Sequence, residues 1–253
     1  MSEQQLYPFL LYSWMGLAVL VFVLLFWVNA PYGRHVRAGW GPTVSARLGW
    51  LIMETPAVVL PVLFFLLGQR HDNPVAIVLL ALWLAHYIHR AFVFPILLRA
   101  AGRAMPLVIV LMAISFNLGN AYFNGRWLFS FGPAYELSWL YDVRFISGAL
   151  CFMVGKAINL HSDHVLRKLR QPGEHGYAIP TGGLYRWVSC PNYLGEIIQW
   201  CGWALATWSL AGLSFALWSI ANLAPRAYAH HRWYHERFET YPRTRRALVP
   251  LLW

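Results

Sequence analysis

Seven long runs of apolar residues dominate this sequence and restrict it to one class of fold. They lie near residues 8–30, 48–68, 74–98, 105–121, 144–162, 192–211 and 212–231. About 20 helical residues cross a hydrocarbon core about 30 Å thick, and only helices or closed barrels satisfy their backbone polar groups inside lipid. The runs therefore predict an all-α integral membrane protein, a bundle of seven transmembrane helices that forms a single domain over residues 1–253.

The composition agrees with that class. Hydrophobic residues make up 58% of the 253 residues and charged residues only 12%, whereas charged residues form about a quarter of an average soluble domain. The first residues, MSEQQLYPFLLYSW, lack the basic start and cleavage site of a signal peptide, so the first run is expected to remain as a helix. The three cysteines form no CxxC motif and no even-numbered set, which predicts neither a disulfide framework nor a thiolate metal site.

The formal charge of +10 is distributed unevenly between alternate loops. One set of loops and the C-terminal tail hold fifteen Lys and Arg residues, and the opposite set holds only three, Arg70, Arg126 and Arg144. The positive-inside rule then predicts that the N-terminus faces outward and the C-terminus lies in the cytoplasm. Because topology accounts for much of the basic excess, no nucleic-acid partner is expected. Without a GxGxxG or GxxxxGK motif, any nucleotide would bind outside a Rossmann fold.

Polar side chains within the predicted helices gather at the cytoplasmic end. Glu54 lies about two helical turns inside the second helix, and the third helix carries His86, Tyr87 and Arg90 in its cytoplasmic half. The last three helices contribute the remaining members, which are Asn159, Asp163, Asn192, Glu196, Arg226, His230 and Tyr234. Ionisable residues are costly in lipid and usually face the bundle interior. The set predicts a functional site, although polar residues also hold membrane helices together.

A carboxyl group and a phenol at similar depth suggest a specific chemistry. A protonated Glu54 is expected to hydrogen-bond Tyr87, whose hydroxyl would donate to a carbonyl oxygen of the substrate. Such a donor pair suits the polarisation of an enone. The alternative is that Glu54 is bonded to a backbone carbonyl and is structural.

The ten histidines raise the alternative of a metal enzyme. The segments HYIH, HSDH and HHRWYH resemble the histidine boxes of membrane di-iron desaturases and hydroxylases, since imidazole suits iron. They lack the repeated adjacent pairs that a full ligand set requires. No metal is therefore predicted, and interfacial or hydrogen-bonding histidines are the simpler explanation.

Several motifs resemble a known family. They are PYGRH, ETPA and HYIHRAFVFP in the N-terminal half, followed by NLHSDHVLRKLRQPGE, YAIPTGGLYRWVSCPNYLGEIIQWCGWALATWSL and PRAYAHHRWYHERFETYPRTRRALVPLLW. Over nearly its whole length the chain resembles the steroid 5-alpha-reductase family, close to the mammalian steroid enzymes. CPNYLGE alone is less specific, because similar segments occur in sterol reductases and in isoprenylcysteine and phospholipid methyltransferases.

The resemblance implies an NADPH-dependent enzyme that reduces the C4–C5 double bond of a 3-oxo-delta-4 steroid, such as testosterone or progesterone. It assigns residues 1–100 mainly to the steroid side, with Glu54 and Tyr87 at the steroid carbonyl, and residues 101–253 mainly to NADPH-binding helices and cytoplasmic loops. The residues that it implies contact NADPH are Tyr32, Arg103, Asn159, Asp163, Arg170, Tyr177, Asn192, Glu196, Arg226, His230 and Tyr234. Two departures stand out: Gln199 replaces a glutamate common in the family, and LLRAAGRAMP, which includes Arg103, is two residues longer than the usual pattern.

The expected protein is a monomer in the bacterial inner membrane or the endoplasmic reticulum, surrounded by lipid, with steroid entering from the bilayer and cofactor from the cytoplasm. Three alternatives remain. A relative that reduces a fatty-acyl thioester or a polyprenol would use the same cofactor. A methyltransferase of the isoprenylcysteine type would bind S-adenosylmethionine and leave Glu54 with Tyr87 without a purpose. A sterol-binding membrane protein would not oxidise NADPH.

Overall fold

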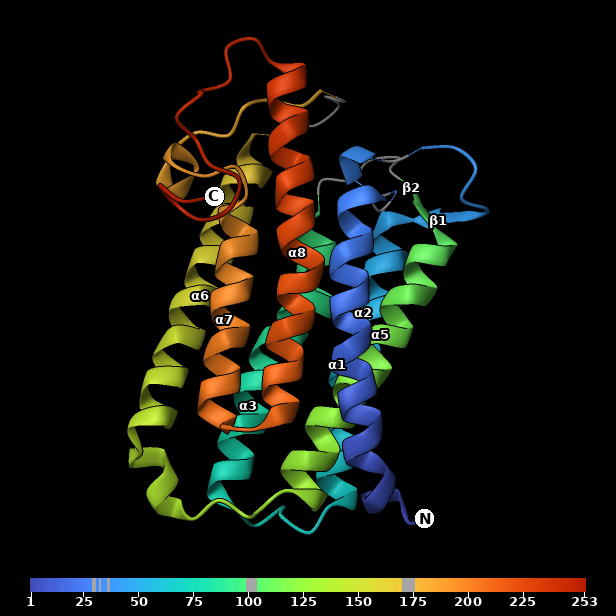
Figure 1. The fold of residues 1–253 in the computed structure, drawn as a ribbon, viewed down its shortest axis with the longest axis vertical. Coiled ribbons are helices and arrows are strands. Elements are labelled where there is room, and N and C mark those ends of the chain that lie inside the picture. Colours follow the sequence, from blue (N-terminus) through green and yellow to red (C-terminus); the bar gives the residue numbers. More distant parts are fainter. Residues whose placement is uncertain (29–30, 32, 36, 99–103, 170–175) are drawn as a thin grey trace. The chain divides into compact units, whose positions relative to one another are not determined.

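The computed structural model describes residues 1–28, 31, 33–35, 37–98, 104–169 and 176–253, and it is built almost entirely of helices (Figure 1). Contacts between residues divide the chain into two compact units. The first unit is Met1–Leu11 with Ala30–Asp142, and the second is Tyr12–Asn29 with Val143–Trp253. The predicted all-α class is confirmed.

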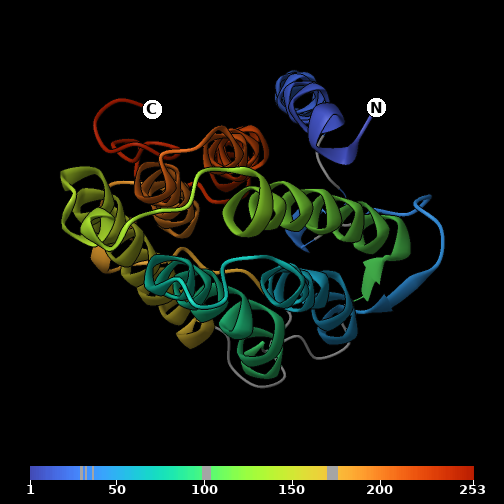
Figure 2. The same cartoon turned by 90° about the horizontal axis from the view of Figure 1, so that it is seen from below.

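The first unit holds the beginning of α1 (Glu3–Trp27) and the elements that follow it as far as Asp142. In chain order these are β1 (Thr43–Ser45), α2 (Ala46–Leu67), α3 (Pro74–Ile88), the π-helix η2 (His89–Val93), α4 (Phe94–Leu97), β2 (Ala104–Pro106), α5 (Leu107–Arg126), the π-helix η3 (Trp127–Phe131) and the 3-10 helix η4 (Leu137–Tyr141). The strands β1 and β2 form an antiparallel ribbon, with Val44 opposite Met105. The ribbon leads directly into α2 and α5, which pack side by side (Figure 2).

A hydrogen bond to a carbonyl that a proline leaves free joins α3 to α2. Pro61 has no backbone N–H, so the carbonyl of Ala57, four residues earlier, loses its helical partner. The indole Nε1 of Trp83 on α3 donates to that carbonyl at 2.8 Å. Since Trp83 is buried, this bond satisfies a polar group that would otherwise be costly inside the unit.

At the end of the first unit away from the ribbon, two arginine side chains bond neighbouring polar groups. The guanidinium of Arg70 donates to the backbone carbonyls of Trp127, Leu128, Ser130 and Gly132, where η3 ends. Carbonyls at a helix C-terminus have no partner within the helix, so one side chain satisfies a whole turn. Nearby, Arg126 forms two hydrogen bonds with the carboxylate of Glu3, at 2.8 and 2.6 Å.

The second unit is built around three long helices and the rest of α1. These are α6 (Val143–Lys168), α7 (Pro191–Thr207) and α8 (Leu210–Arg237), and the 3-10 helix η5 (Gly183–Arg186) precedes α7. The helix α7 packs against both α6 and α8. Trp14 of α1 lies against Trp218 of α8, with ring centroids 4.6 Å apart, and its carbonyl accepts a hydrogen bond from the Trp218 indole.

Glycines allow α6 and α7 to approach until their backbones touch. Gly148 and Gly155 on α6 face Gly202 and Gly195 on α7. A Cβ at Gly195 would lie 2.6 Å from the Gly155 carbonyl oxygen, and one at Gly202 would lie 2.6 Å from the Gly148 carbonyl oxygen. Small residues favour such close packing of membrane helices. We call these four residues the glycine seam.

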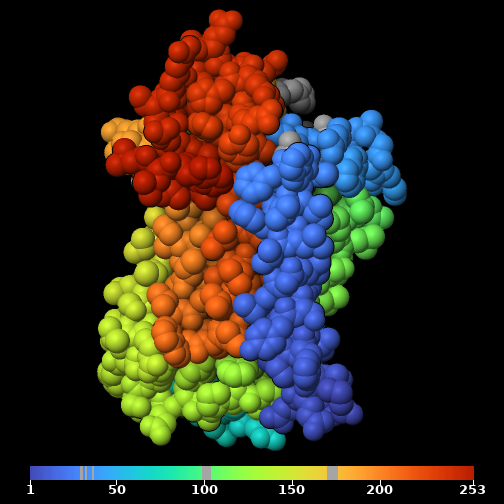
Figure 3. All heavy atoms as spheres, viewed as in Figure 1, coloured from blue at the N-terminus to red at the C-terminus, as the bar shows by residue number. Residues whose placement is uncertain are grey.

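Within the part of the chain that the structure describes, five helical stretches are long and apolar enough to cross a membrane. They are Glu3–Trp27, Ala46–Leu67, Pro74–Leu97, Leu107–Phe131 and Val143–Lys168. The atoms of α1 lie at the surface in Figure 3. Its apolar side chains, such as Phe9 and Val19, are largely exposed. The helix α7 has only 17 residues, and α8 carries polar residues in its second half. Spans at α7 and α8, and the orientation of the termini, stay predictions.

Candidate active site

Glu54 on α2 is held by a neighbouring helix. The amide Nδ2 of Asn117, on α5, donates to Glu54 Oε2 at 3.2 Å and to the backbone carbonyl of Met53 at 2.6 Å. Asn117 is only 3% exposed, and the Glu54 side chain is 12% exposed. The Asn117 amide therefore bonds both the backbone of α2 and the carboxyl group that α2 carries at Glu54.

A cation approaches Glu54 from the other side. Arg90 Nε lies 3.9 Å from Glu54 Oε1, and the Arg90 side chain is 16% exposed. Its guanidinium lies over the rings of Trp50 and Phe94, at 4.5 and 5.0 Å from their centroids, in a cation–π arrangement. Arg90 belongs to the π-helix η2, a distortion that often occurs at functional sites because it redirects side chains.

Tyr87 lies between the two points at which this segment is fastened to α2. Trp83 contacts α2 at Ala57, and Arg90 contacts it at Glu54. The Tyr87 ring lies 5.0 Å from the Trp83 ring, one helical turn away, and Tyr87 is 3% exposed. Glu54 and Arg90 are therefore paired and half-buried, and the buried Tyr87 lies three residues before Arg90 along the same segment. The direct Glu54–Tyr87 hydrogen bond and the roles of the two residues stay predictions.

A second polar group joins α6 to α7 in the second unit. Asn159 Nδ2 donates to the Asn192 carbonyl at 3.0 Å, and Asn192 Nδ2 donates to Asp163 Oδ1 at 3.2 Å. Asn159 and Asp163 are 3% and 7% exposed, although they belong to the last turns of α6. Three of the residues predicted to bind cofactor therefore form one hydrogen-bonded group, next to the glycine seam.

The helix α8 presents its predicted residues beside this group. His230 Nε2 lies 3.4 Å from the Tyr193 hydroxyl, one residue after Asn192, and Arg226 donates to Asn222 on its own helix. Glu196 is half-buried one turn after Asn192 on α7. Tyr177 lies with its ring 5.0 Å from that of Trp233.

Tyr234, also on α8, stacks on a tyrosine that belongs to a hydroxyl network. It is 2% exposed and stacks on Tyr241, with centroids 5.0 Å apart and planes 5° apart. The Tyr241 hydroxyl lies 2.7 Å from Ser189 Oγ, and Ser189 Oγ lies 2.6 Å from His231 Nδ1. Burial raises the pKa of Tyr241, while hydrogen bonds with Ser189 and Arg245 oppose that shift. We call Ser189, His231 and Tyr241 the serine–tyrosine network.

Gln199, noted above as a departure from the expected pattern, is fully buried beside the seam. A neutral amide is less costly there than a carboxylate would be. Three further predicted residues, Tyr32, Arg103 and Arg170, lie outside the described part of the chain. Among the residues that the structure describes, no group of three or more His, Cys, Asp and Glu side chains is suited to hold a metal ion.

Comparison with known proteins identifies the family. Residues 103–253 match the family model of 3-oxo-5-alpha-steroid 4-dehydrogenase. The chain is 42% identical to 3-oxo-5-alpha-steroid 4-dehydrogenase 1 of Bos taurus over 256 residues, which cover 100% of this chain and 99% of the bovine protein. The chain belongs to this family. It is therefore an oxidoreductase that acts on a CH–CH bond, and the resemblance seen in its motifs is confirmed.

Two other relatives of this chain come from a plant and from human. Steroid 5-alpha-reductase DET2 of Arabidopsis thaliana is 43% identical over 237 residues, covering 91% of this chain and 90% of the plant protein. The human 3-oxo-5-alpha-steroid 4-dehydrogenase 1 is 40% identical over 253 residues, covering 99% and 97%. The likeness therefore extends over both compact units.

Three features of the site were missed by sequence reasoning. Asn117 had a signal, because it is an amide inside an apolar run. The seven-residue spacing of Gly148 with Gly155, and of Gly195 with Gly202, also predicts a close helix contact. The serine–tyrosine network had no signal in the sequence, because it joins residues that are 42 and 52 positions apart.

Proposed function

We propose that this enzyme uses NADPH to reduce the C4–C5 double bond of a 3-oxo-delta-4 steroid. Membership of the family supports the reaction class. The observation that carries the proposal is the half-buried pair of Glu54 and Arg90, which together with the Trp83–Ala57 hydrogen bond joins α2 to the segment that carries the buried Tyr87.

Tyr87 and Glu54 are proposed to bind the C3 carbonyl oxygen of the steroid. The phenol of Tyr87 donates a hydrogen bond to that oxygen, and Glu54 supports the phenol. Asn117 and Arg90 hold Glu54 in place. Preorganised donors that face developing negative charge in a buried site stabilise the transition state more than donors in water do.

The second polar group suits a dinucleotide. Asp163 and the amides of Asn159 and Asn192 offer acceptors and donors for ribose hydroxyls and for a carboxamide. Arginine forks match phosphate oxygens, so we assign the phosphates of NADPH to Arg170 and Arg103. Tyr177, Glu196, Arg226, His230 and Tyr234 complete the proposed cofactor site.

When bound, NADPH supplies a hydride to C5 of the steroid. Electron density then moves through the enone to the C3 oxygen, where the hydrogen bond from Tyr87 stabilises the enolate. The enolate takes up a proton from solvent at C4, which restores the ketone. The protein residues bind, orient and polarise the substrate, and the redox step belongs to the cofactor.

The topology completes the proposal. We propose that the C-terminus and the cofactor site lie on the cytoplasmic side of the bacterial inner membrane or of the endoplasmic reticulum. The steroid is proposed to enter the site from the bilayer. The enzyme is proposed to act as a monomer.

The test is NADPH oxidation by the detergent-purified protein with testosterone or progesterone, with the C5 configuration of the product determined by NMR. Tyr87→Phe and Glu54→Gln are expected to lower kcat about 100-fold or more with little change in NADPH affinity. Tyr12→Phe, at an exposed tyrosine of α1, is the control. A variant with unchanged turnover would remove that residue from the mechanism.

Other outcomes separate the alternatives. NADPH binding without steroid reduction would favour a fatty-acyl thioester or polyprenol substrate. Failure to bind NADPH would leave a methyltransferase as the leading alternative, and S-adenosylmethionine binding would then be measured.

A further inference from the structure

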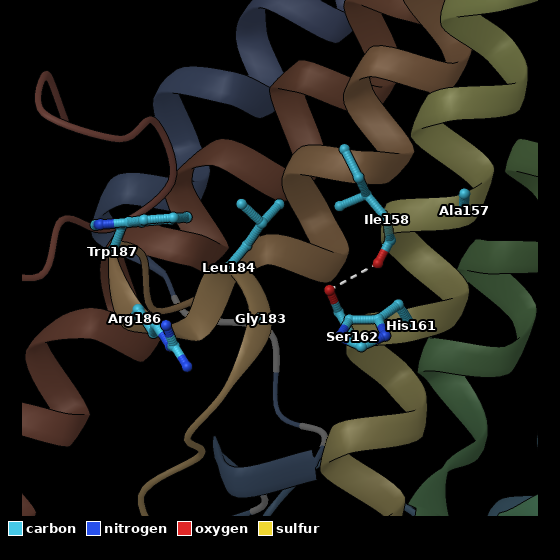
Figure 4. Close-up of a pocket in the computed structure, with 8 residues that line it drawn as sticks. All are labelled: Ala157, Ile158, His161, Ser162, Gly183, Leu184, Arg186 and Trp187. Atoms are coloured by element: carbon cyan, nitrogen blue, oxygen red, sulfur yellow. Dashed lines mark hydrogen bonds between the residues drawn. The ribbon is translucent and has the colours of Figure 1, made fainter.

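A groove of about 510 Å³ lies in the second unit between α6 and the segment 183–187 (Figure 4). On one side α6 contributes Ala157, Ile158 and His161, and on the other side lie Leu184, Arg186 and Trp187. Its volume falls within the range of small-molecule sites, about 300–1,000 Å³. The groove is mostly apolar, with its basic groups on His161 and Arg186.

The groove continues a stripe of exposed apolar residues on α6. Leu150, Met153 and Val154 are 61%, 56% and 52% exposed, and α6 is one of the candidate membrane spans. Their spacing leads to Ala157 and Ile158 in steps of three and four residues, which keeps one face of a helix. A lipid chain lying along this face of α6 therefore reaches the groove without leaving apolar surface.

This face differs from the one that carries the proposed cofactor residues. At 100° per residue, the stripe lies roughly opposite Asn159 and Asp163 on the helix. Those two side chains are buried against α7, whereas Ala157 and His161 are exposed. The groove is thus a separate feature of the same helix.

The end of the groove is basic and aromatic. Arg186 is exposed, and Trp187 is 52% exposed beside it. Arg167 and Lys168 end α6 nearly two turns beyond His161. Tryptophan is enriched where membrane meets water, and basic pockets next to membrane helices bind anionic head groups. Apolar surface followed by Trp and Arg matches a lipid chain followed by its phosphate.

A glycine lines the groove where the loop passes close to His161. Gly183 has a φ of +50°, a conformation that other residues rarely adopt. A Cβ there would lie 2.6 Å from His161 Nε2. The glycine therefore lets the loop pass close to His161 and keeps Leu184 and Arg186 opposite α6.

We propose that this groove binds an anionic phospholipid. One acyl chain lies along the α6 stripe and between Ile158 and Leu184, and the phosphate is bound by Arg186 with His161 nearby. The site is independent of the proposed reductase chemistry, because none of its residues belongs to either polar group described above.

The test is native mass spectrometry of the full-length protein, delipidated and then titrated with phosphatidylglycerol or phosphatidylcholine. The wild type is expected to bind phosphatidylglycerol preferentially. Arg186→Gln is expected to weaken phosphatidylglycerol about fivefold, the effect of one basic residue near an anionic head group. Arg243→Gln, which removes an exposed arginine outside the groove, is the matched control and should leave the preference unchanged.

A second pair of variants tests the apolar part. Ala157→Phe fills the groove from an exposed position and should reduce the binding of both lipids, whereas Ala81→Phe, at an exposed alanine of α3 outside the groove, should not. Equal binding of both lipids by the wild type, or the same affinity after Arg186→Gln, would overturn the proposal. A loss of NADPH affinity in Arg186→Gln without a loss of lipid would overturn it as well, since the groove would then belong to the cofactor.

Discussion

The two polar groups of this enzyme are held in different ways. In the first unit, side chains reach across to another helix: Asn117 to Glu54, and Trp83 to the carbonyl that Pro61 leaves free. In the second unit, the backbones of α6 and α7 touch along the glycine seam, and Asn159 bonds the main chain of Asn192. Long side chains tolerate small shifts of a helix, and backbone contacts do not. A change in the seam should therefore have broader effects than a change in the contacts around Glu54.

The largest effect is expected at the seam. Gly195→Leu places a side chain where even a Cβ would lie 2.6 Å from the Gly155 carbonyl oxygen, so α6 and α7 must separate. We expect destabilisation of about 1–3 kcal/mol or more and at least a tenfold loss of NADPH affinity. Thermal unfolding and NADPH titration in detergent measure both. Gly16→Leu, at a glycine with open space around it, is the control; equal effects of both changes would refute the role of the seam.

A smaller and more selective effect is expected at Asn117. Asn117→Leu removes the amide that orients the Glu54 carboxyl group, and a buried polar group left without its partner costs about 1–3 kcal/mol. We expect kcat to fall about 10- to 100-fold with the NADPH affinity unchanged. Ser115→Ala, which removes only a bond to its own helix, is the control. A parallel loss of NADPH affinity would mean that the two groups are not separable.

The serine–tyrosine network should have a graded effect on the cofactor. Tyr241→Leu removes the ring that stacks on Tyr234, and Tyr241→Phe removes only the hydroxyl bonded to Ser189. Since aromatic pairs contribute about 0.5–1.5 kcal/mol, we expect NADPH affinity to fall about three- to tenfold for Leu and less for Phe. Tyr228→Leu, at a more exposed tyrosine of α8, should change little. The reverse order would show that the hydroxyl, and not the stack, positions Tyr234.

The smallest effect is expected from an exposed ion pair. Arg232 and Glu236 lie one turn apart on α8, at 3.3 Å, and both are about two-thirds exposed. Such pairs contribute about 0.3–0.5 kcal/mol. Glu236→Gln should leave the unfolding temperature and NADPH affinity nearly unchanged. A large change would show that this end of α8 takes part in the cofactor site.

The helices were largely predictable from the sequence, because apolar runs of membrane length leave few alternatives. The expected run 144–162 lies inside α6, and 48–68 agrees with α2 to within two residues at each end. The run 105–121 was too short, since α5 continues to Arg126 although its second half contains asparagines and a glycine. Hydropathy alone cannot follow a helix whose polar residues are buried.

The depth of each site residue within its helix could be predicted from the sequence, but the contacts between these residues could not. Asn159, Asp163 and Asn192 do form one group, as their positions near the ends of neighbouring helices suggested. The partners of Glu54 were not found, because the sequence does not tell which helix faces meet. Nor does it show that His89–Val93 forms a π-helix, which changes the direction of Arg90.

The bond between Trp83 and the Ala57 carbonyl has an evolutionary consequence. The Ala57 carbonyl is available to Trp83 because Pro61 lacks the backbone N–H that would otherwise bond it. A relative with any other residue at position 61 regains that hydrogen and no longer needs an indole at position 83. The two positions should therefore change together across the family, and their covariation would indicate that this hydrogen bond joins α2 to α3 in the relatives as well.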